Sequence, residues 1–115
     1  MELFARISRG IAKLIFRLLG RATIIDIPTD RFNGLVKELN QEGWKNVYEY
    51  NGFDAWIDYG NISLWKNFSK LKLEWDNWTE GSIEGNKKII AKIAERDKNL
   101  KVVNYWRWSI YDKQS

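Results

Sequence analysis

The sequence predicts an α+β fold in which a mostly antiparallel sheet of five or six strands carries two helices on one face. Apolar residues recur at helical spacing over residues 31–42 and 87–96, and short extended segments fill the chain between them. Strand runs bracketed by helices favour a layer of helices on an antiparallel sheet. A further helical periodicity precedes this pattern, so the expected order is α-β-α-β-β-β-β-α-β.

The N-terminal segment differs in charge from the rest of the 115-residue chain. Residues 1–21 contain five basic residues and one acidic residue, whereas the remaining residues contain 14 of each kind. On a helix the cations share one sector, and apolar side chains fill the wider remainder. These cations are Arg6, Arg9, Lys13, Arg17 and Arg21. We expect a basic amphipathic helix over residues 1–21, appended to a single α+β domain over residues 22–115.

The first two elements of the domain have clear boundaries. Residues 22–27 form an apolar run that predicts a strand, and Pro28 ends it. Thr29 favours the start of a helix, and Gly43 favours its end. The apolar spacing between them predicts an amphipathic helix over residues 31–42.

Four extended segments are expected next, separated by turns. They cover residues 47–50, 53–59, 62–66 and 71–78, with turns at 51–52, 60–61 and 67–70. Asn51-Gly52 predicts a two-residue hairpin, because both central positions of such a turn need positive φ. Asn86 then favours the start of a helix over residues 87–96, and residues 100–111 are rich enough in β-branched and aromatic side chains to predict a last strand.

Composition limits the chemistry. The chain has no Cys and no His, which excludes disulfides, thiolate metal sites and the usual general base near neutral pH. Carboxylates two apart, such as Glu74 with Asp76, lie about 7 Å from each other on any acidic strand, so they do not indicate a glycosidase pair or a metal site. We expect that this chain is not an enzyme and that it binds neither a cofactor nor a metal ion.

Side-chain alternation on the expected strands predicts a surface of acids and tryptophans. Phe53, Ala55, Ile57 and Tyr59 are expected inward, as are Leu71, Leu73 and Trp75, so the residues between them face outward. The candidate partner-binding residues are Asp54, Trp56, Asp58, Glu74, Asp76, Trp78, Glu80 and Glu84. The alternatives are that these acids pair with neighbouring lysines on a solvated face, or that the N-terminal helix covers Trp56.

Trp106-Arg107-Trp108 has the composition of a base-stacking site. Alternation on a strand places the two Trp on one face and Arg107 on the other, so no single ligand contacts all three. Core packing is therefore favoured for the Trp side, and nucleic acid is a disfavoured partner.

Three roles remain open for residues 1–21: packing on the domain, contact with an anionic membrane surface, or binding of a partner or a second copy. The segment has no membrane span or signal-peptide core, because Lys13 and Arg17 interrupt its apolar residues. A cytoplasmic location is expected, with the inner face of the membrane as the alternative. The oligomeric state is not indicated.

The chain resembles the small single-domain immunity proteins of bacterial contact-dependent and polymorphic toxin systems in its small size, its lack of His and Cys, its lack of nucleotide or metal motifs, and its acid-and-Trp surface. Residues 75–81, with the sequence WDNWTEG, followed by Ile83-Glu84-Gly85, look like a patterned turn of a small bacterial protein family. The resemblance implies an antitoxin-type protein that binds a cognate toxin domain and blocks it. Such proteins are often acidic, whereas this chain has a net charge of +4.

Overall fold

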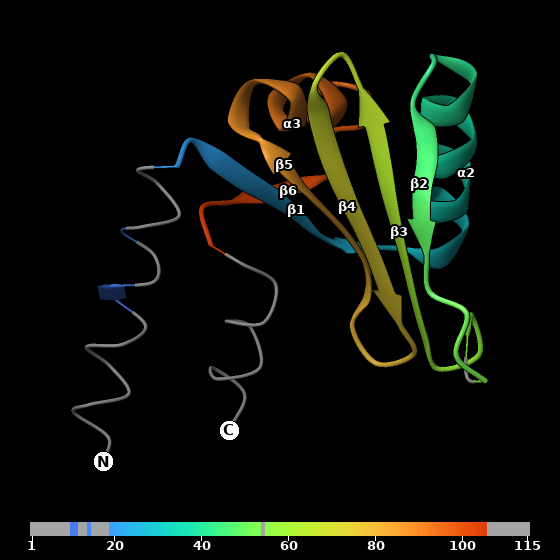
Figure 1. The fold of residues 1–115 in the computed structure, drawn as a ribbon. Coiled ribbons are helices and arrows are strands. Elements are labelled where there is room, and N and C mark those ends of the chain that lie inside the picture. Colours follow the sequence, from blue (N-terminus) through green and yellow to red (C-terminus); the bar gives the residue numbers. More distant parts are fainter. Residues whose placement is uncertain (1–9, 12–13, 15–18, 54, 106–115) are drawn as a thin grey trace.

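The computed structural model describes residues 10–11, 14, 19–53 and 55–105 (Figure 1). Its elements are β1 (Arg21–Ile27), α2 (Thr29–Gln41), β2 (Lys45–Glu49), β3 (Tyr59–Lys66), β4 (Ser69–Asp76), β5 (Glu80–Asn86), α3 (Lys87–Ala94) and β6 (Lys101–Val103). The predicted α+β class and both helices of the domain are confirmed. Arg6, Arg9, Lys13 and Arg17 of the expected N-terminal helix lie outside the described residues, as do residues 106–111 of the expected last strand.

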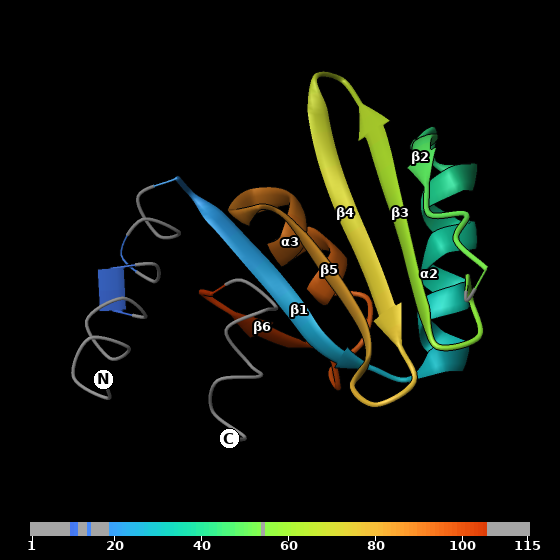
Figure 2. The same cartoon turned by 60° about the horizontal axis from the view of Figure 1, so that its bottom comes forward.

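The strands form one six-stranded sheet in the order β2-β3-β4-β5-β1-β6. All neighbouring strands are antiparallel, as the sequence predicts. The two edge strands, β2 and β6, lie at opposite sides of the twisted sheet (Figures 1 and 2). The pairing of β2 with β3 is irregular between Asn46 and Tyr48, which marks a bulge on that edge.

One hydrophobic core joins both helices to the sheet. Phe32, Leu35 and Leu39 of α2 and Ile90 and Ile93 of α3 are buried in it. The sheet contributes alternate residues from its central strands, including Ile24, Leu64, Leu71, Leu73 and Ile83, all fully buried. The core therefore lies on one face of the sheet, and the opposite face carries the side chains that alternate with it.

Strand β5 lies in the middle of the sheet, between β4 and β1, although the sequence pattern predicts no strand over its residues. Glycine is depleted in strands, and β5 contains two. A Cβ atom at Gly81 would lie 2.5 Å from Cδ2 of Phe32, and one at Gly85 would lie 2.5 Å from Cδ2 of Leu71. The glycines are required because large core side chains pack directly on the backbone of this strand.

The expected hairpin at Asn51-Gly52 is wrong. β2 pairs with β3, the connection between them spans residues 50–58, and most of the segment 53–59 forms turns instead of the predicted strand. The Trp56 ring lies against Gly60, and its centroid is 6.3 Å from that of Phe32, so the chain turns here toward α2. Gly60-Asn61, expected as a turn, lies inside β3.

The two-residue hairpin turn occurs instead at Asn67-Phe68, between β3 and β4. Lys66 pairs with Ser69 on either side of it, and φ is 50° at Asn67 and 64° at Phe68. Positive φ at both central positions defines a type I′ turn, which normally carries Gly or Asn. Phenylalanine at the second position is therefore unusual.

A cluster of ion pairs joins α2 to the end of α3. Glu38 accepts hydrogen bonds from Arg31 at 2.6 Å and from Arg96 at 3.1 Å, and Arg96 also pairs with Glu42. The hydrogen bond from Arg31 is the main reason that the pKa of Glu38 lies below its ordinary value. The hydrogen bond to Glu42 is the main reason that the pKa of Arg96 is raised.

We expect Gly81→Ala to lower the free energy of unfolding by about 1–3 kcal/mol, because the new methyl group overlaps the Phe32 ring. Gly34→Ala is the matched control: its Cβ would lie 3.5 Å from Nη1 of Arg31, an ordinary contact, and alanine in a helix adds about 0.5–1 kcal/mol of stability. Urea denaturation measures both. Equal effects of the two substitutions would contradict the packing of Phe32 on β5.

The stability contributed by Glu38 is expected to depend on pH. Because its pKa is lowered in the folded state, the contribution is complete above the pKa of the unfolded carboxyl group and is lost as pH falls through the folded value. Glu38→Gln should lower the melting temperature at pH 7 and have much less effect at about pH 2, where the native carboxyl group is also protonated. Glu95→Gln removes no ion pair of the described residues, so it should leave the melting temperature unchanged at both pH values.

Candidate interaction surface

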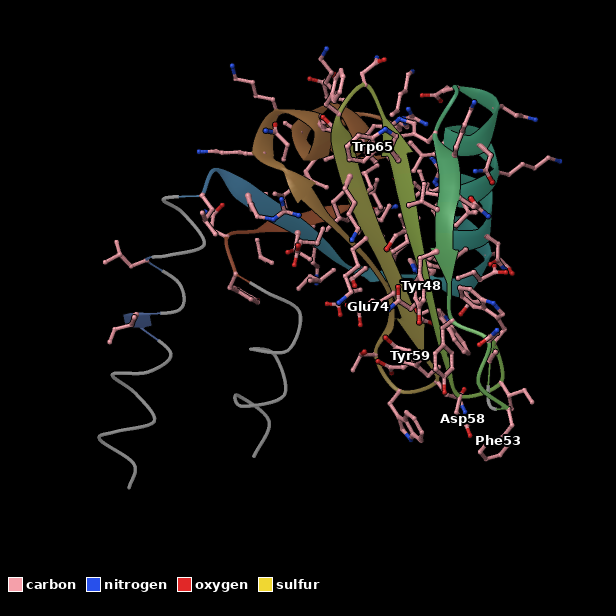
Figure 3. All side chains as sticks on the ribbon, viewed as in Figure 1. Tyr48, Phe53, Asp58, Tyr59, Trp65 and Glu74 are labelled. Atoms are coloured by element: carbon pink, nitrogen blue, oxygen red, sulfur yellow. The ribbon has the colours of Figure 1, made fainter. Side chains whose placement is uncertain are left out.

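Two connections meet at one end of the sheet. Residues 50–58 join β2 to β3, and residues 77–79 join β4 to β5. The backbone N–H of Asn77 donates to the carbonyl oxygen of Asp58 at 3.0 Å, and the Asn77 side chain reaches the Asp58 carboxylate at 3.5 Å. Figure 3 places Phe53 and Asp58 together at this end. We call it the acidic aromatic end and define it as residues 50–58 and 77–80.

Large apolar side chains are exposed on the acidic aromatic end. The exposed fraction is 99% for Phe53, 67% for Ile57 and 77% for Trp78. Single exposed apolar residues are common, but several on adjoining loops are typical of interaction sites. Phe53 and Ile57 were both expected in the core, on the basis of a strand that does not form.

Trp56 was predicted to lie at the centre of an outer sheet face, and this prediction is wrong. It is 38% exposed and turns toward α2, where it lines a pocket of about 150 Å³ with Thr29, Asn33 and Trp75. The indole N–H of Trp75 donates to Oγ1 of Thr29 at 2.9 Å and closes one wall. Most of Trp56 thus supports the loop, and only its remaining edge is available to a partner.

Asp76 is buried, so its expected position on the outer surface is wrong. Its Oδ1 accepts the backbone N–H groups of Trp78 at 2.8 Å and Thr79 at 2.6 Å, and its Oδ2 accepts the Thr79 hydroxyl at 2.6 Å. Aspartate accepts backbone N–H groups two and three residues further along in this way when it fixes a tight turn. Asp76 therefore holds the turn that presents Trp78.

Glu74 lies within β4, opposite Asn61 of β3 and Ser82 of β5, and not in either connection (Figure 3). It accepts a hydrogen bond from the Tyr59 hydroxyl at 3.2 Å and pairs with Lys72 at 3.1 Å. Burial and the charge of Glu74 raise the pKa of Tyr59. Burial disfavours the charged form of Lys72, but its hydrogen bond to Glu74 and the attraction of that charge together raise the pKa of Lys72. Lys72 thus pairs with Glu74, as the solvated-face alternative predicts.

Glu84 is also separate from the acidic aromatic end. It is opposite Thr23 of β1 and Lys72 of β4 in the sheet, and it accepts hydrogen bonds from Nη2 of Arg21 at 2.9 Å and from Nε at 3.2 Å. Glu80 is exposed and lies at the end itself, opposite Asp76. Asp54 lies outside the described residues.

Of the eight predicted residues, the structure places four at the acidic aromatic end: Trp56, which turns partly toward α2, and Asp58, Trp78 and Glu80. Phe53 and Ile57 join them and were missed. The signal that identifies their segment as a loop is its density of Asn, Gly and Asp at positions 51, 52, 54 and 58, which is typical of turns.

No group of three or more acidic side chains in the described part of the chain is placed to hold a metal ion. No helix within those residues is long and apolar enough to cross a bilayer. The chain matches no protein-family model, no curated protein and no solved structure.

We expect Asp76→Ala to lower the free energy of unfolding by about 1–3 kcal/mol, because it leaves two backbone N–H groups of the turn without their acceptor. Asp58→Ala removes one long side-chain hydrogen bond and should change stability by less than about 0.5 kcal/mol. Chemical denaturation measures both values. If Asp76→Ala were as mild as Asp58→Ala, Asp76 would not be what fixes the turn.

Proposed function

We propose that this chain is a non-enzymatic protein-binding module of the immunity or antitoxin type, which blocks a cognate toxin domain through its acidic aromatic end. The single observation that carries the proposal is the exposure of Phe53, Ile57 and Trp78 at the acidic aromatic end, whose residues, 50–58 and 77–80, include three acidic residues and no basic one. Aromatic anchors surrounded by charge are typical of the energetic centres of protein interfaces.

The geometry of the end favours binding without large rearrangement. Asp76 fixes the turn that carries Trp78, and the hydrogen bonds between Asn77 and Asp58 join that turn to the other connection. A surface that is already ordered loses less conformational entropy on association. Trp78 therefore serves as a preorganised anchor in this proposal, with Phe53 and Ile57 beside it.

Charge supports a basic partner. Asp58 and Glu80 are described at this end, Asp54 belongs to the same connection, and no lysine or arginine occurs in residues 50–58 or 77–80. Complementary charge speeds association and selects among partners. The active sites of toxins that act on nucleic acid are usually basic, so an acidic end of this kind suits their inhibition. The net positive charge of the chain belongs to residues 1–21, and residues 22–115 are neutral in sum.

The proposal includes a cytoplasmic location and needs no cofactor. Glu74 and Glu84 take no part in it, because each already has a cationic partner in the sheet. The alternative function is peripheral membrane association through residues 1–21. It rests on the amphipathic charge pattern of that segment.

The test is purification of the tagged full-length protein from its native cells, with soluble and membrane fractions kept apart and bound proteins identified by mass spectrometry. We expect one stoichiometric soluble partner whose toxicity is neutralised by co-expression of this chain. Trp78→Ala and Asp58→Lys should each weaken the affinity for the purified partner at least tenfold, a loss typical of interface anchors. Calorimetry measures these affinities.

Two matched variants control for general effects. Phe68→Ala removes an exposed aromatic residue at the opposite end of the sheet, and Glu95→Lys reverses an exposed charge after α3. Both should keep the wild-type affinity. If Trp78→Ala bound as tightly as these controls, the acidic aromatic end would not be the binding surface. Recovery from the membrane fraction without a protein partner would favour the alternative function.

A further inference from the structure

The β3–β4 hairpin forms the opposite end of the sheet and has a different chemistry. Its tip is Asn67-Phe68, and Trp65 lies just before it, at the upper end of the sheet in Figure 3. Lysines surround these aromatic residues. We call this region the basic tip and define it as residues 65–70 together with Lys45, Lys87, Lys88 and Lys92.

Phe68 is placed at the tip at a conformational cost. It is 92% exposed, and its φ of 64° is disfavoured for a bulky side chain. Its ring makes one aromatic contact, edge-on with Trp65 at 6.2 Å between centroids. Trp65 is itself 42% exposed. Neither burial nor turn geometry accounts for phenylalanine at this position. Its exposed ring therefore indicates contact with a ligand.

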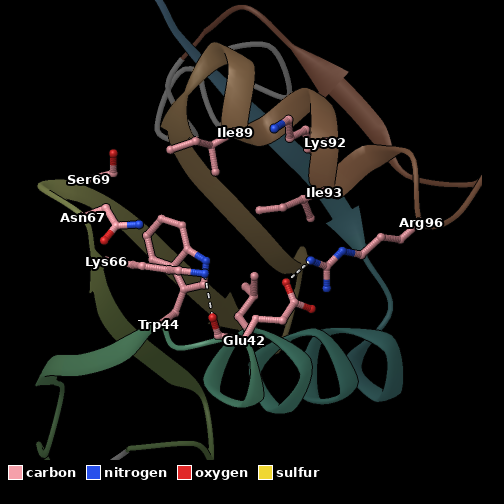
Figure 4. A pocket seen from close by; sticks show the side chains of 10 residues that line it. Glu42, Trp44, Lys66, Asn67, Ser69, Ile89, Lys92, Ile93 and Arg96 are labelled. Carbon is pink, nitrogen blue, oxygen red and sulfur yellow. Dashed lines mark hydrogen bonds and ion pairs between the residues drawn. The ribbon is translucent and has the colours of Figure 1, made fainter.

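The lysines of the basic tip come from three parts of the fold. Lys45 and Lys70 are both opposite Trp65 in the sheet, one on each neighbouring strand. Lys66 and Lys92 line one pocket of about 300 Å³ with Asn67 and Ser69, so α3 lies beside the hairpin (Figure 4). Lys87 and Lys88 begin α3 directly after β5, whose Gly85 lies beside the backbone of Lys70.

These charges are not neutralised within the described residues. No carboxylate of that part of the chain lies within ion-pair distance of the six ammonium groups, and Lys66 donates instead to the carbonyl oxygen of Glu42 at 2.6 Å. The one acidic side chain lining the pocket, Glu42, is paired with Arg96 (Figure 4). The basic tip is therefore a positive patch around a protruding apolar ring.

We propose that the basic tip binds the surface of an anionic phospholipid bilayer, with Phe68 inserted among the acyl chains and Trp65 at the headgroup level. Lysines near a membrane are attracted to its negative surface potential, and an exposed aromatic side chain gains from burial at the interface. Single-stranded nucleic acid instead binds in a groove whose aromatic rings stay free for stacking. Phe68 stands at the summit of a hairpin, which suits a bilayer better.

The chain has no cysteine, so Phe68→Cys creates a unique attachment site for an environment-sensitive fluorophore such as NBD. Mixed with phosphatidylglycerol vesicles, the labelled full-length protein should show a blue shift and a severalfold rise in emission. Phosphatidylcholine vesicles should give neither change. The same label at Trp78→Cys, on the opposite end, should stay in water. This readout reports on the surroundings of position 68 itself and not on binding elsewhere in the chain.

Unlabelled variants test the roles of the ring and the charges. Phe68→Gly suits the type I′ turn, so it should preserve or raise the melting temperature while weakening binding to phosphatidylglycerol vesicles about tenfold. Lys70→Glu should weaken it by a similar factor, whereas Lys98→Glu, an exposed lysine outside the basic tip, should not. Unchanged binding in both Phe68→Gly and Lys70→Glu, or an unshifted label at position 68, would overturn the proposal. A label that shifts with a single-stranded oligonucleotide and not with vesicles would overturn it too, in favour of nucleic acid.

Discussion

The packing of Phe32 on the backbone of β5 is the contact on which the rest of the structure depends. It lets α2 approach the centre of the sheet at Gly81, and it provides the aromatic surface against which Trp56 turns. The position of Trp56 in turn keeps its segment from forming the predicted strand and leaves Phe53 and Ile57 in solvent. One close contact between a helix and a strand therefore decides both the depth of the core and the shape of the acidic aromatic end.

Antiparallel connectivity then separates the charges. Consecutive turns of a meander fall at alternate ends of a sheet, so the connections after β2 and β4 meet at one end and the turn after β3 lies at the other. Acidic residues occur in the first group, and lysines flank the second. Residues 22–115 are neutral in sum, yet the fold places acidic residues at one end of the sheet and basic residues at the other. Each end also carries exposed aromatic side chains.

Strong local periodicity in the sequence predicts several elements of this fold correctly. Helices α2 and α3, strand β1 and the inward positions of Leu71 and Leu73 follow from apolar spacing, and the structure confirms them. Local sequence does not predict the structure where a distant residue decides it. Asn51-Gly52 has the composition of a hairpin turn, but the contact of Trp56 with Phe32 governs that segment. The sequence of β5 resembles that of a loop because it contains two glycines. These glycines make room for the side chains of Phe32 and Leu71, which the sequence pattern does not reveal. The candidate site was predicted least well, because one of the two strands from which its alternation was derived is a loop and the other ends at Asp76, which is buried.

The sheet leaves little opportunity for another chain to extend it. β2 is only five residues long and bulged between Asn46 and Tyr48, and β6 has three residues. Short, irregular edges of this kind pair poorly with a further strand and resist edge-to-edge aggregation. Recognition through backbone hydrogen bonds is thereby disfavoured, and a binding partner must be selected by side chains. Specificity in this molecule can accordingly change through substitutions in its turns, without any alteration of the sheet that supports them.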